Sequence, residues 1–314
     1  MTLVVLFHYG EFQPLWQQRG LLQCGPHIAA NSPGIQVIAS RVPDLQQSLL
    51  SKGLTPSGVL VNYIDPFLIR ASPLTELDSW VGPKLLVCGD LHHGPNPIGT
   101  LVTYQAKEFH DAVLVSFNPV LLQEVRSHLA VPVHSIPPGF FRYPTRPLNP
   151  YFQNRLIHVG SLGIHHPRRR QIVTKLLERK QIPFTHTVTR NNEEAADLYN
   201  GSALVLNIPL NNDLNHRFFE IMAAGSRQII FGNKQLLGPH YELANRKDIF
   251  WVQTIEQLED LVIKLFRNPH LLKFEILPPP SYDLIDLLKS CFGIREIPSW
   301  SKADTSTIYR ELQG

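Results

Sequence analysis

Short apolar runs alternate with amphipathic segments along most of this chain, and that alternation restricts its fold more than any other feature. In the first half, the runs VLVNYI (59–64), KLLVC (84–88) and AVLVSF (112–117) are almost continuously apolar. Further runs lie at 2–7, 35–39 and 133–136. Strands that alternate with helices form parallel sheets covered by helices, which buries both faces of each strand. We therefore predict an α/β fold built on parallel sheets.

A proline-rich segment interrupts the alternation and predicts a domain boundary. Residues 137–150 read PPGFFRYPTRPLNP, with five prolines and no periodicity. The alternation resumes near residue 155, with amphipathic segments at 167–180 and 255–267. A length of 314 residues fits two domains of ordinary size. The expected organisation is an N-terminal domain over 1–140, a linker over 141–154, a second domain over 155–277, a C-terminal helix over 278–293 and a tail over 294–314.

Composition narrows the class of protein. Hydrophobic residues make up 43% and charged residues 18%, as in a globular protein, and a net charge of +3 is too small to favour a nucleic-acid partner. Three widely spaced cysteines form neither a metal motif nor a disulfide framework, which favours a reducing compartment. No apolar run is long enough to span a membrane, and the first run lacks the basic region of a signal peptide. We expect a cytoplasmic protein without an integral membrane segment.

The stretch 206–232 carries the strongest candidate for a binding site. It reads as a strand, a polar loop that includes Asn212 and Asp213, a short helix and a second strand. Arg217 and Glu220 are three residues apart and therefore share one face of that helix. A cation and a carboxylate at a strand–helix crevice suit a ligand with both a phosphate and a hydroxylated sugar, as in a nucleotide sugar. The alternative is an ordinary Arg–Glu pair on the surface of an amphipathic helix.

A glycine-containing turn at the start of the second domain is a candidate anion site. Gly160, Ser161 and Gly163 follow an apolar strand and precede a helix. The glycines let the backbone approach a ligand closely, and the amide end of the helix attracts anions. Arg168 and Arg169 fall in the first turn of that helix, where an arginine fork matches the oxygens of a diphosphate. The alternative is a solvated basic face.

The N-terminal half offers candidates for acid–base chemistry. Asp90, His92 and His93 follow the strand KLLVC at its carboxyl end, where the ligand sites of parallel sheets lie. A histidine there suits a general base because its pKa is near neutrality. His93 is favoured over His92 because Gly94 gives the backbone freedom to turn the ring. The alternatives are a structural loop and a metal-binding fragment, although adjacent histidines lack the spacing of a tetrahedral site.

Three segments, in order and at the expected spacing, resemble one family. They are IHVGSLGIHHPRRRQIVTKLLER (157–179), RFFEIMAAG (217–225) and KDIFWVQTIEQLEDLVIKLFRNP (247–269). They are similar to the donor domain of GT-B glycosyltransferases of the glycosyl transferases group 1 kind, and most of all to the spore-maturation-protein-like (CgeB type) group. The resemblance implies two Rossmann-type parallel-sheet domains facing a cleft. It also implies a metal-independent enzyme with no cofactor, whose nucleotide-diphosphate sugar is a co-substrate.

Residue by residue, the resemblance carries over in part. Glu220 matches the family glutamate that faces the ribose of the nucleotide. Asn212 occupies a position where many retaining relatives have a second glutamate, and Ser161 lies where an arginine is common. The cation for the phosphates is then expected to be Arg168, Arg169 or Arg217. Retention or inversion at the anomeric carbon is not assigned by this pattern.

These observations favour a glycosyltransferase that moves a sugar from a nucleotide-diphosphate sugar to an unknown acceptor, which is a glycan, a lipid or a protein. The first alternative is a catalytically inactive GT-B-like protein that binds a nucleotide or acts as a scaffold. The second is another two-domain α/β enzyme, such as a sugar-nucleotide epimerase. A dinucleotide-dependent oxidoreductase is disfavoured because no G-x-G-x-x-G follows any strand.

Overall fold

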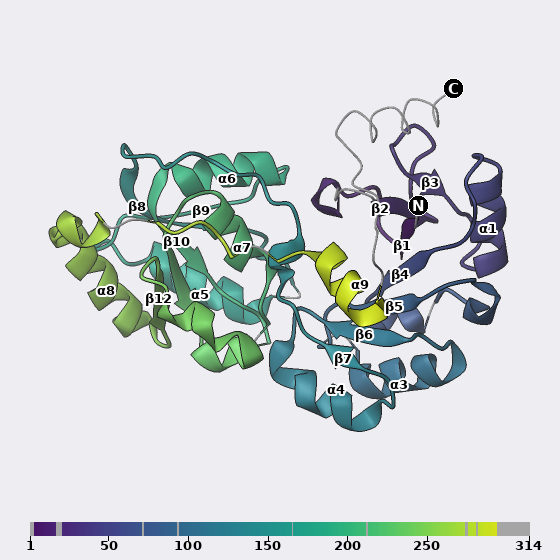
Figure 1. Ribbon diagram of the computed structural model, residues 1–314. Coiled ribbons are helices and arrows are strands. Elements are labelled where there is room, and N and C mark those ends of the chain that lie inside the picture. Colours follow the sequence, from purple (N-terminus) through teal and green to yellow (C-terminus); the bar gives the residue numbers. More distant parts are fainter. Residues whose placement is uncertain are drawn as a thin grey trace. The chain divides into compact units, whose positions relative to one another are not determined.

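The computed structural model describes residues 3–16, 21–70, 72–92, 94–164, 166–211, 213–273, 276–280 and 282–293. The chain forms two compact units, coloured in sequence order in Figure 1. Unit 1 comprises Met1–Arg142 and Tyr282–Gly314, and unit 2 comprises Tyr143–Ser281. Unit 2 is therefore inserted, in sequence, within unit 1.

Among the described residues, unit 1 is built on a seven-stranded sheet in the order β3-β2-β1-β4-β5-β6-β7. Its strands are β1 (Val4–His8), β2 (Leu21–Gly25), β3 (Ile35–Gln36), β4 (Val59–Ile64), β5 (Lys84–Cys88), β6 (Ala112–Val115) and β7 (Val133–His134). Each neighbouring pair in this sheet is parallel. The parallel α/β architecture predicted from the alternation is confirmed for this unit.

Five α-helices belong to the described part of unit 1. They are α1 (Val42–Leu50), α2 (Pro66–Ile69), α3 (Pro97–Lys107), α4 (Leu122–His128) and α9 (Leu284–Phe292). Residues from α1, α3 and α4 share one core cluster with residues from β1, β4, β5 and β6. Helix α9 follows unit 2 in the sequence but belongs to unit 1, and its Leu284 and Leu288 are buried.

Strand β2 is the element of this sheet that the apolar pattern does not predict. Its central residue, Gln23, is polar yet fully buried. The Gln23 amide is satisfied by Gln13, whose N–H donates to Oε1 at 3.0 Å and whose carbonyl accepts from Nε2 at 2.9 Å. Oε1 also lies 3.1 Å from Nε2 of His8. A buried polar residue with all its partners supplied by other segments leaves no periodic signal in the sequence.

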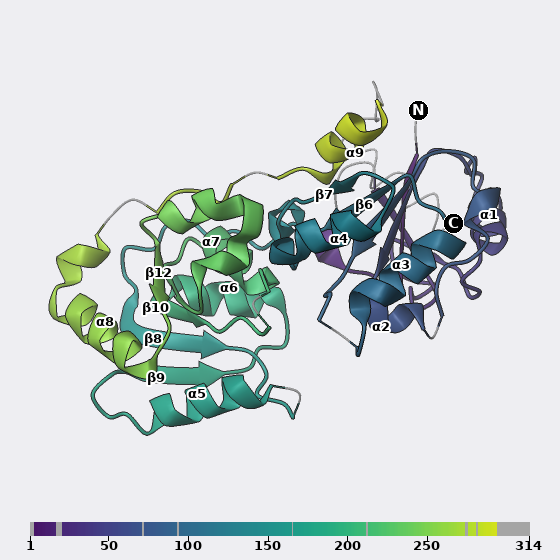
Figure 2. The ribbon, with the colours of Figure 1, turned by 90° about the horizontal axis from the view of Figure 1, so that it is seen from below.

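Among the described residues, unit 2 is built on a five-stranded parallel sheet in the order β12-β11-β10-β8-β9. Its strands are β8 (Gln153–Val159), β9 (Phe184–Thr187), β10 (Ser202–Asn207), β11 (Gln228–Phe231) and β12 (Ile249–Val252). Figure 2 shows β12, β10, β8 and β9 one after another in this order. The strand order reverses between β8 and β10, and the carboxyl ends of strands at such a switch point are where α/β proteins bind ligands.

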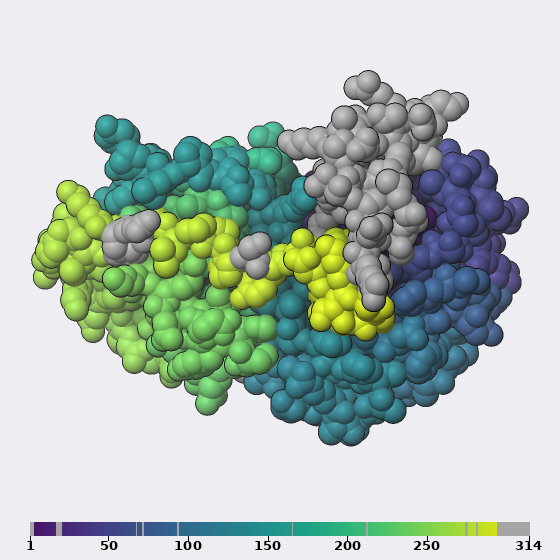
Figure 3. Space-filling model, viewed as in Figure 1, coloured from purple at the N-terminus to yellow at the C-terminus, as the bar shows by residue number. Residues whose placement is uncertain are grey.

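Helices cover both faces of the unit 2 sheet. They are α5 (Pro167–Leu177), α6 (Asn192–Asn200), α7 (His216–Ala223) and α8 (Ile255–Arg267). Side chains of α5 and α8 share a core cluster with β8, β10 and β11, whereas side chains of α6 and α7 pack on β8 and β10 in a second cluster. Figure 3 shows α8, in yellow-green, at the surface of this unit. In the described part of the chain, no helix has the length and apolar character needed to cross a membrane.

Helix α7 begins and ends where its sequence dictates. Asn215 precedes it, and the Asn215 Oδ1 accepts the N–H of Phe218 at 3.1 Å, which caps the first turn. Gly225 follows the last turn with φ +65°, the left-handed conformation that glycine adopts without strain. Five of its residues are buried, while Arg217 and Glu220 are only partly so. This geometry presents the two charged side chains from one face.

Candidate functional site

Arg217 lies directly over the turn that follows β8. Gly160, the first residue of that turn, has φ +143°, which side chains rarely tolerate. A Cβ at Gly160 would overlap Nη2 of Arg217, so the guanidinium packs on bare backbone. Glycine is therefore required here both by its dihedral angle and by the close approach of a cation. The structure brings together two segments that are 57 positions apart in the sequence.

Arg169 reaches the same place from helix α5. Its side chain is 8% exposed, and its Nη1 and Nη2 donate to the carbonyls of Ser161 at 3.4 Å and Ile208 at 3.3 Å. These carbonyls belong to the loops after β8 and β10, so Arg169 bridges the two strand ends at the switch point. Arg168, its neighbour, is exposed. The sequence alone predicts the same role for Arg168 and Arg169, and the structure distinguishes them because only Arg169 is buried.

The two guanidinium groups are close enough to perturb each other. The pKa of Arg169 is lowered to about 10, first by burial and then by the Arg217 charge, while Asp213 opposes both. Nε of Arg169 and Nε of Arg217 are buried, and neither has a hydrogen-bond partner among the described residues. Buried donors without partners are costly, and two neighbouring cations repel. An anion with several oxygens bound between them would lower both costs.

His158 lies beneath these arginines on strand β8. Its Nδ1 is 3.1 Å from Nδ1 of His186 on β9, and its Nε2 has no partner among the described residues. The pKa of His158 is lowered to about 2 by burial and then by Arg217, Arg169 and His186. His158 is therefore neutral at pH 7. The sequence does not single it out, because a histidine inside the apolar run IHVG resembles an ordinary core residue.

Glu220 lies one turn of α7 beyond Arg217. Burial raises the pKa of Glu220, whereas Arg217 and a hydrogen bond from Tyr199 act to lower it. Tyr199, on α6, is 1% exposed, and its pKa is raised to about 12 by burial. Because a carboxylate only accepts hydrogen bonds, the tyrosine hydroxyl donates to it. Sequence reasoning missed Tyr199, which reaches the site only through the packing of α6 against α7.

The loop after β10 is held by paired amides. Asn207 and Asn215 donate to each other at 3.2 and 3.1 Å, which joins the end of β10 to the cap of α7. Asp213 is half-buried, its N–H donates to the Leu210 carbonyl at 2.9 Å, and its charge acts on Arg169. Asn212, the remaining loop candidate, lies outside the described residues.

The turn after β8 leads into the uncapped end of α5. Ser161 is exposed, and its Oγ accepts the N–H of Gly163 at 3.1 Å, which stabilises the turn. His166 precedes α5 and provides no side-chain cap. The first N–H groups of α5 therefore receive no side-chain cap from His166, and N–H groups at a helix start attract anions. The buried Arg169 belongs to the same first turn of α5.

The N-terminal candidates lie at the carboxyl end of β5 in unit 1. The Asp90 N–H donates to Asp65 at 2.7 Å, and the Asp90 carboxylate accepts the His92 N–H at 2.9 Å. The N–H of Leu91 donates to Asn118 at 2.7 Å. These bonds tie the backbone of the loop to Asp65, which follows β4, and to Asn118, which follows β6. His92 is half-buried, and its Nε2 has no hydrogen-bond partner among the described residues.

His93, the preferred base in the sequence prediction, lies outside the described residues. Within the part of the chain that the structure describes, no group of three histidine, cysteine, aspartate or glutamate side chains is arranged to hold a metal ion. Of the three acid–base candidates in this loop, the structure therefore describes Asp90 and His92.

Comparison with known proteins assigns a family likeness to part of the chain. Residues 161–273 match a family model described as glycosyl transferase-like. This region contains α5, the loop after β10 and all of α7. No curated protein sequence matches the chain.

Solved structures share the fold. Sucrose-phosphate synthase from Thermosynechococcus elongatus has a TM-score of 0.50 at 12% identity, over 100% of this chain and 99% of that one. A mutant form of TarM from S. aureus, in complex with fondaparinux, α-GlcNAc-glycerol and UDP, has a TM-score of 0.50 at 11% identity over 87% of this chain. The Gap123 complex of Streptococcus agalactiae has a TM-score of 0.48 at 12% identity over 80% of this chain.

This chain spans 58% of the TarM chain and 55% of the Gap123 chain. The family match and the shared fold confirm the resemblance to GT-B glycosyltransferases and the architecture of two Rossmann-like units. The narrower likeness to the CgeB type stays a prediction.

Proposed function

We propose that this protein is a glycosyltransferase that binds a nucleotide-diphosphate sugar in unit 2 and transfers the sugar to an acceptor. The family match and the fold support sugar transfer in general. The observation that carries the finer proposal is the pair Arg169 and Arg217, each with a buried Nε that lacks a partner among the described residues, at the switch point over Gly160. The TarM structure in complex with UDP agrees with this choice of ligand.

Each group at the site has a role in this proposal. The diphosphate accepts hydrogen bonds from Arg169, Arg217 and the first N–H groups of α5. Ser161 and Gly163 shape the turn that allows this approach, and Glu220 accepts the ribose hydroxyls. Of the two adjacent arginines, the buried Arg169 is the better phosphate ligand, and the exposed Arg168 adds charge at longer range. Asn212 and Asp213 border the transferred sugar.

The chemistry then requires stabilisation of a leaving diphosphate. Two guanidinium groups already held in a partly dehydrated site supply this stabilisation without a divalent metal. The proposed reaction uses no cofactor, because the nucleotide sugar is itself a co-substrate. Asp90, His92 and His93 are the proposed acid–base residues for the acceptor hydroxyl. The acceptor is a glycan, a lipid or a protein.

The function is tested by binding and by hydrolysis. Thermal shifts with UDP-, GDP-, ADP- and dTDP-sugars should show one preferred base, because a ligand that binds the folded state raises its melting temperature. Slow hydrolysis of the preferred nucleotide sugar, unchanged by EDTA, would support a metal-independent transferase. Binding without hydrolysis or transfer would favour the inactive GT-B-like alternative, to which Asn212 and Ser161 point as departures from the family. No shift with any of the four would contradict the proposal.

Replacing Glu220 by alanine should weaken binding of the preferred nucleotide roughly tenfold or more, because charge-assisted hydrogen bonds to the ribose contribute about 1.5–3 kcal/mol. The nucleoside should lose as much affinity as the diphosphate, since both carry the ribose. Isothermal titration of both ligands measures this. Glu178→Ala, an exposed glutamate after α5, is the charge-matched control. Affinities that match those of the native protein would remove Glu220 from the binding site.

Replacing His92 by alanine should lower turnover roughly tenfold and leave nucleotide affinity unchanged, because positioned acid–base groups act on the reaction step. The loop backbone, held by Asp65 and Asn118, should keep its fold in this variant. Turnover and affinity are measured on the same preparation. His128→Ala, at an exposed position of α4, is the control. Equal turnover in both variants would make the His92 side chain dispensable for catalysis.

A further inference from the structure

The chain passes from unit 1 into unit 2 through residues that are anchored on both sides of the boundary. The Arg142 N–H donates to the Leu15 carbonyl at 2.9 Å, and Phe141 packs on Trp16 with ring centroids 4.4 Å apart. The next residue, Tyr143, is 9% exposed, and its hydroxyl lies 2.7 Å from Nδ1 of His216 on α7. Anchorage to unit 1 and anchorage to unit 2 therefore fall on consecutive residues.

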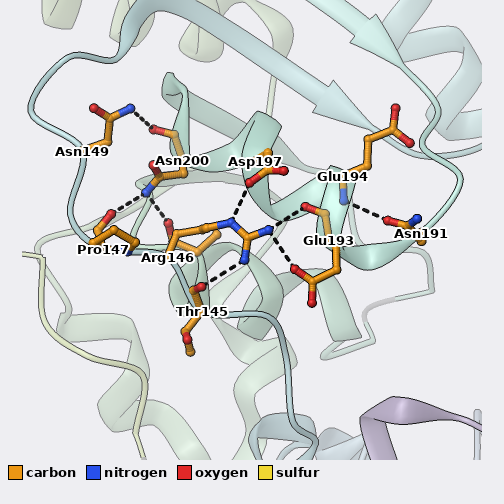
Figure 4. Close-up of polar contacts among 10 residues, drawn as sticks. Thr145, Arg146, Pro147, Asn149, Asn191, Glu193, Glu194, Asp197 and Asn200 are labelled. Atoms are coloured by element: carbon orange, nitrogen blue, oxygen red, sulfur yellow. Dashed lines mark hydrogen bonds and ion pairs between the residues drawn. The ribbon is translucent and has the colours of Figure 1, made fainter.

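Residues 143–149, which we call the strap, continue along α6 and α7. Figure 4 shows Arg146 at the centre of the strap contacts. Its Nε donates to Asp197 at 2.6 Å, and its Nη2 donates to the Glu193 carboxylate at 2.8 Å. The Arg146 backbone N–H donates to the Ala223 carbonyl at 3.2 Å. The strap thus binds the side of α6 and the last residue of α7.

Asn200 joins the strap to the end of α7 a second time. Its Nδ2 donates to the Pro147 carbonyl at 2.9 Å and to the Ala224 carbonyl at 2.8 Å. A Cβ added to Gly225 would lie 3.3 Å from the Arg146 carbonyl, so the strap passes close to the helix end. These contacts satisfy carbonyl groups that a helix end leaves without intrahelical partners.

The strap therefore fixes α7 at both ends. Tyr143 contacts His216, the first residue of α7, and Arg146 contacts Ala223, its last. Arg217 is adjacent to His216, and Glu220 lies between the two anchors. Movement of the first turn of α7 would displace the Arg217 guanidinium from its position over Gly160.

The strap contacts differ in strength. Glu193 and Asp197 have side chains that are 67% exposed, so their ion pairs with Arg146 are screened by water and contribute little. The Tyr143–His216 bond is shielded from water on the tyrosine side and is the contact nearest Arg217. It is therefore the contact whose removal should affect the site most.

We propose that the strap positions α7 for phosphate binding and that Tyr143 is a positioning residue, which acts on the ligand only through His216 and Arg217. This inference rests on the proposed function for its effect on affinity. Its structural part concerns α7 alone and is testable without any ligand.

The first experiment compares Tyr143→Phe with Tyr151→Phe, a control at a tyrosine that is 90% exposed. Amide hydrogen exchange of the first turn of α7, without ligand, should be roughly fivefold faster in Tyr143→Phe, as expected for the loss of one hydrogen bond. Tyr151→Phe should exchange like the native protein. Native exchange rates in Tyr143→Phe would overturn the strap proposal, whether or not the protein binds nucleotides.

The second experiment titrates the tightest binder among UDP, GDP, ADP and dTDP, together with its nucleoside. Tyr143→Phe should weaken the diphosphate about threefold to fivefold and leave the nucleoside unchanged, because the strap acts through Arg217. Equal weakening of both ligands would indicate general loosening and contradict the positioning role. If the native protein binds none of the four, the proposed function fails and the exchange result alone decides on the strap. Should Tyr143→Phe not fold, Arg146→Gln tests the other end, where exchange of the last turn of α7 should accelerate.

Discussion

Replacing Arg217 by alanine should weaken binding of the preferred nucleoside diphosphate roughly 10- to 100-fold, the range expected when a charged hydrogen-bonding group is lost. The guanidinium lies over the Gly160 backbone with a buried Nε that has no partner among the described residues. Its geometry therefore suits phosphate oxygens and leaves the base and ribose to other residues. The bare nucleoside should bind the variant almost as well as the native protein.

Titration of nucleoside, monophosphate and diphosphate tests this selectivity. Arg179→Ala removes the same charge just beyond the C-terminal end of α5, where its partner is Glu259, and serves as the control. Removal of Arg217 relieves the repulsion on Arg169 but also removes the charge that offsets the burial of Glu220, so thermal melts of this variant and of Arg179→Ala accompany the titrations. Equal weakening of all three ligands would mean that Arg217 supports the fold or contacts the base.

Lowering the pH from 7.5 to 5 should destabilise the folded protein once the pH falls below about 6.5, by about 1.4 kcal/mol per pH unit for each buried neutral histidine. The pKa of His158 is lowered to about 2 and that of His216 to about 4, in both cases mainly by burial. In unit 1, burial lowers the pKa of His8 to about 4 and that of His110 to about 3.

The direction of this pH dependence follows from which state, folded or unfolded, binds protons first as the pH falls. Below the ordinary histidine pKa of 6.5, the unfolded chain binds protons at these residues, whereas the folded chain does not until its own lower pKa is reached. Stability is therefore fully present above about pH 6.5 and is lost progressively as the pH falls. Glu220 acts in the opposite direction, because its pKa is raised and the folded protein takes up this proton at a higher pH than the unfolded chain does. This opposing contribution begins above the ordinary pKa of 4.5, so the decline measured down to pH 5 is the net effect of the histidines and Glu220.

Thermal melts across this window measure the effect. His158→Asn should show a shallower decline of melting temperature with falling pH, because one neutral histidine is removed. His128→Asn, at an exposed position, should keep the native slope. A melting temperature that is flat between pH 7.5 and 5 would contradict the assignment of these histidines as neutral and buried.

The fold could be predicted from the sequence wherever periodicity and local signals agree. The segment 255–267 is amphipathic, begins after a threonine cap and forms α8 over those same residues. The chain's alternation of apolar runs and amphipathic segments also predicts parallel sheets. Strand β2 departs from the pattern because Gln23 is buried through partners from elsewhere in the chain. Whether such a polar residue is buried in a strand depends on its tertiary contacts and not on the local composition.

Only part of the candidate site could be predicted from the sequence. Arg217 and Glu220 could be paired from their helical spacing, but Arg168 and Arg169 occupy successive helix positions, and only the packing of α5 decides which one is buried. Tyr199 and His158 carry no signal in the sequence, because Tyr199 lies on an amphipathic helix and His158 in an apolar strand, and both meet the arginines only through the packing of these elements. Asn212 and His93 lie outside the described residues, so their roles stay predictions.

The insertion of unit 2 within unit 1 has a consequence for the order in which the protein matures on the ribosome. Unit 2 is continuous in sequence, so all of it has been synthesised once residue 281 is added. Unit 1 still lacks α9 at that moment, and with it the buried side chains of Leu284 and Leu288. Domains tend to fold as units once their chain is available. Unit 1, whose strands are synthesised first, is therefore expected to be completed last, after unit 2 has already formed.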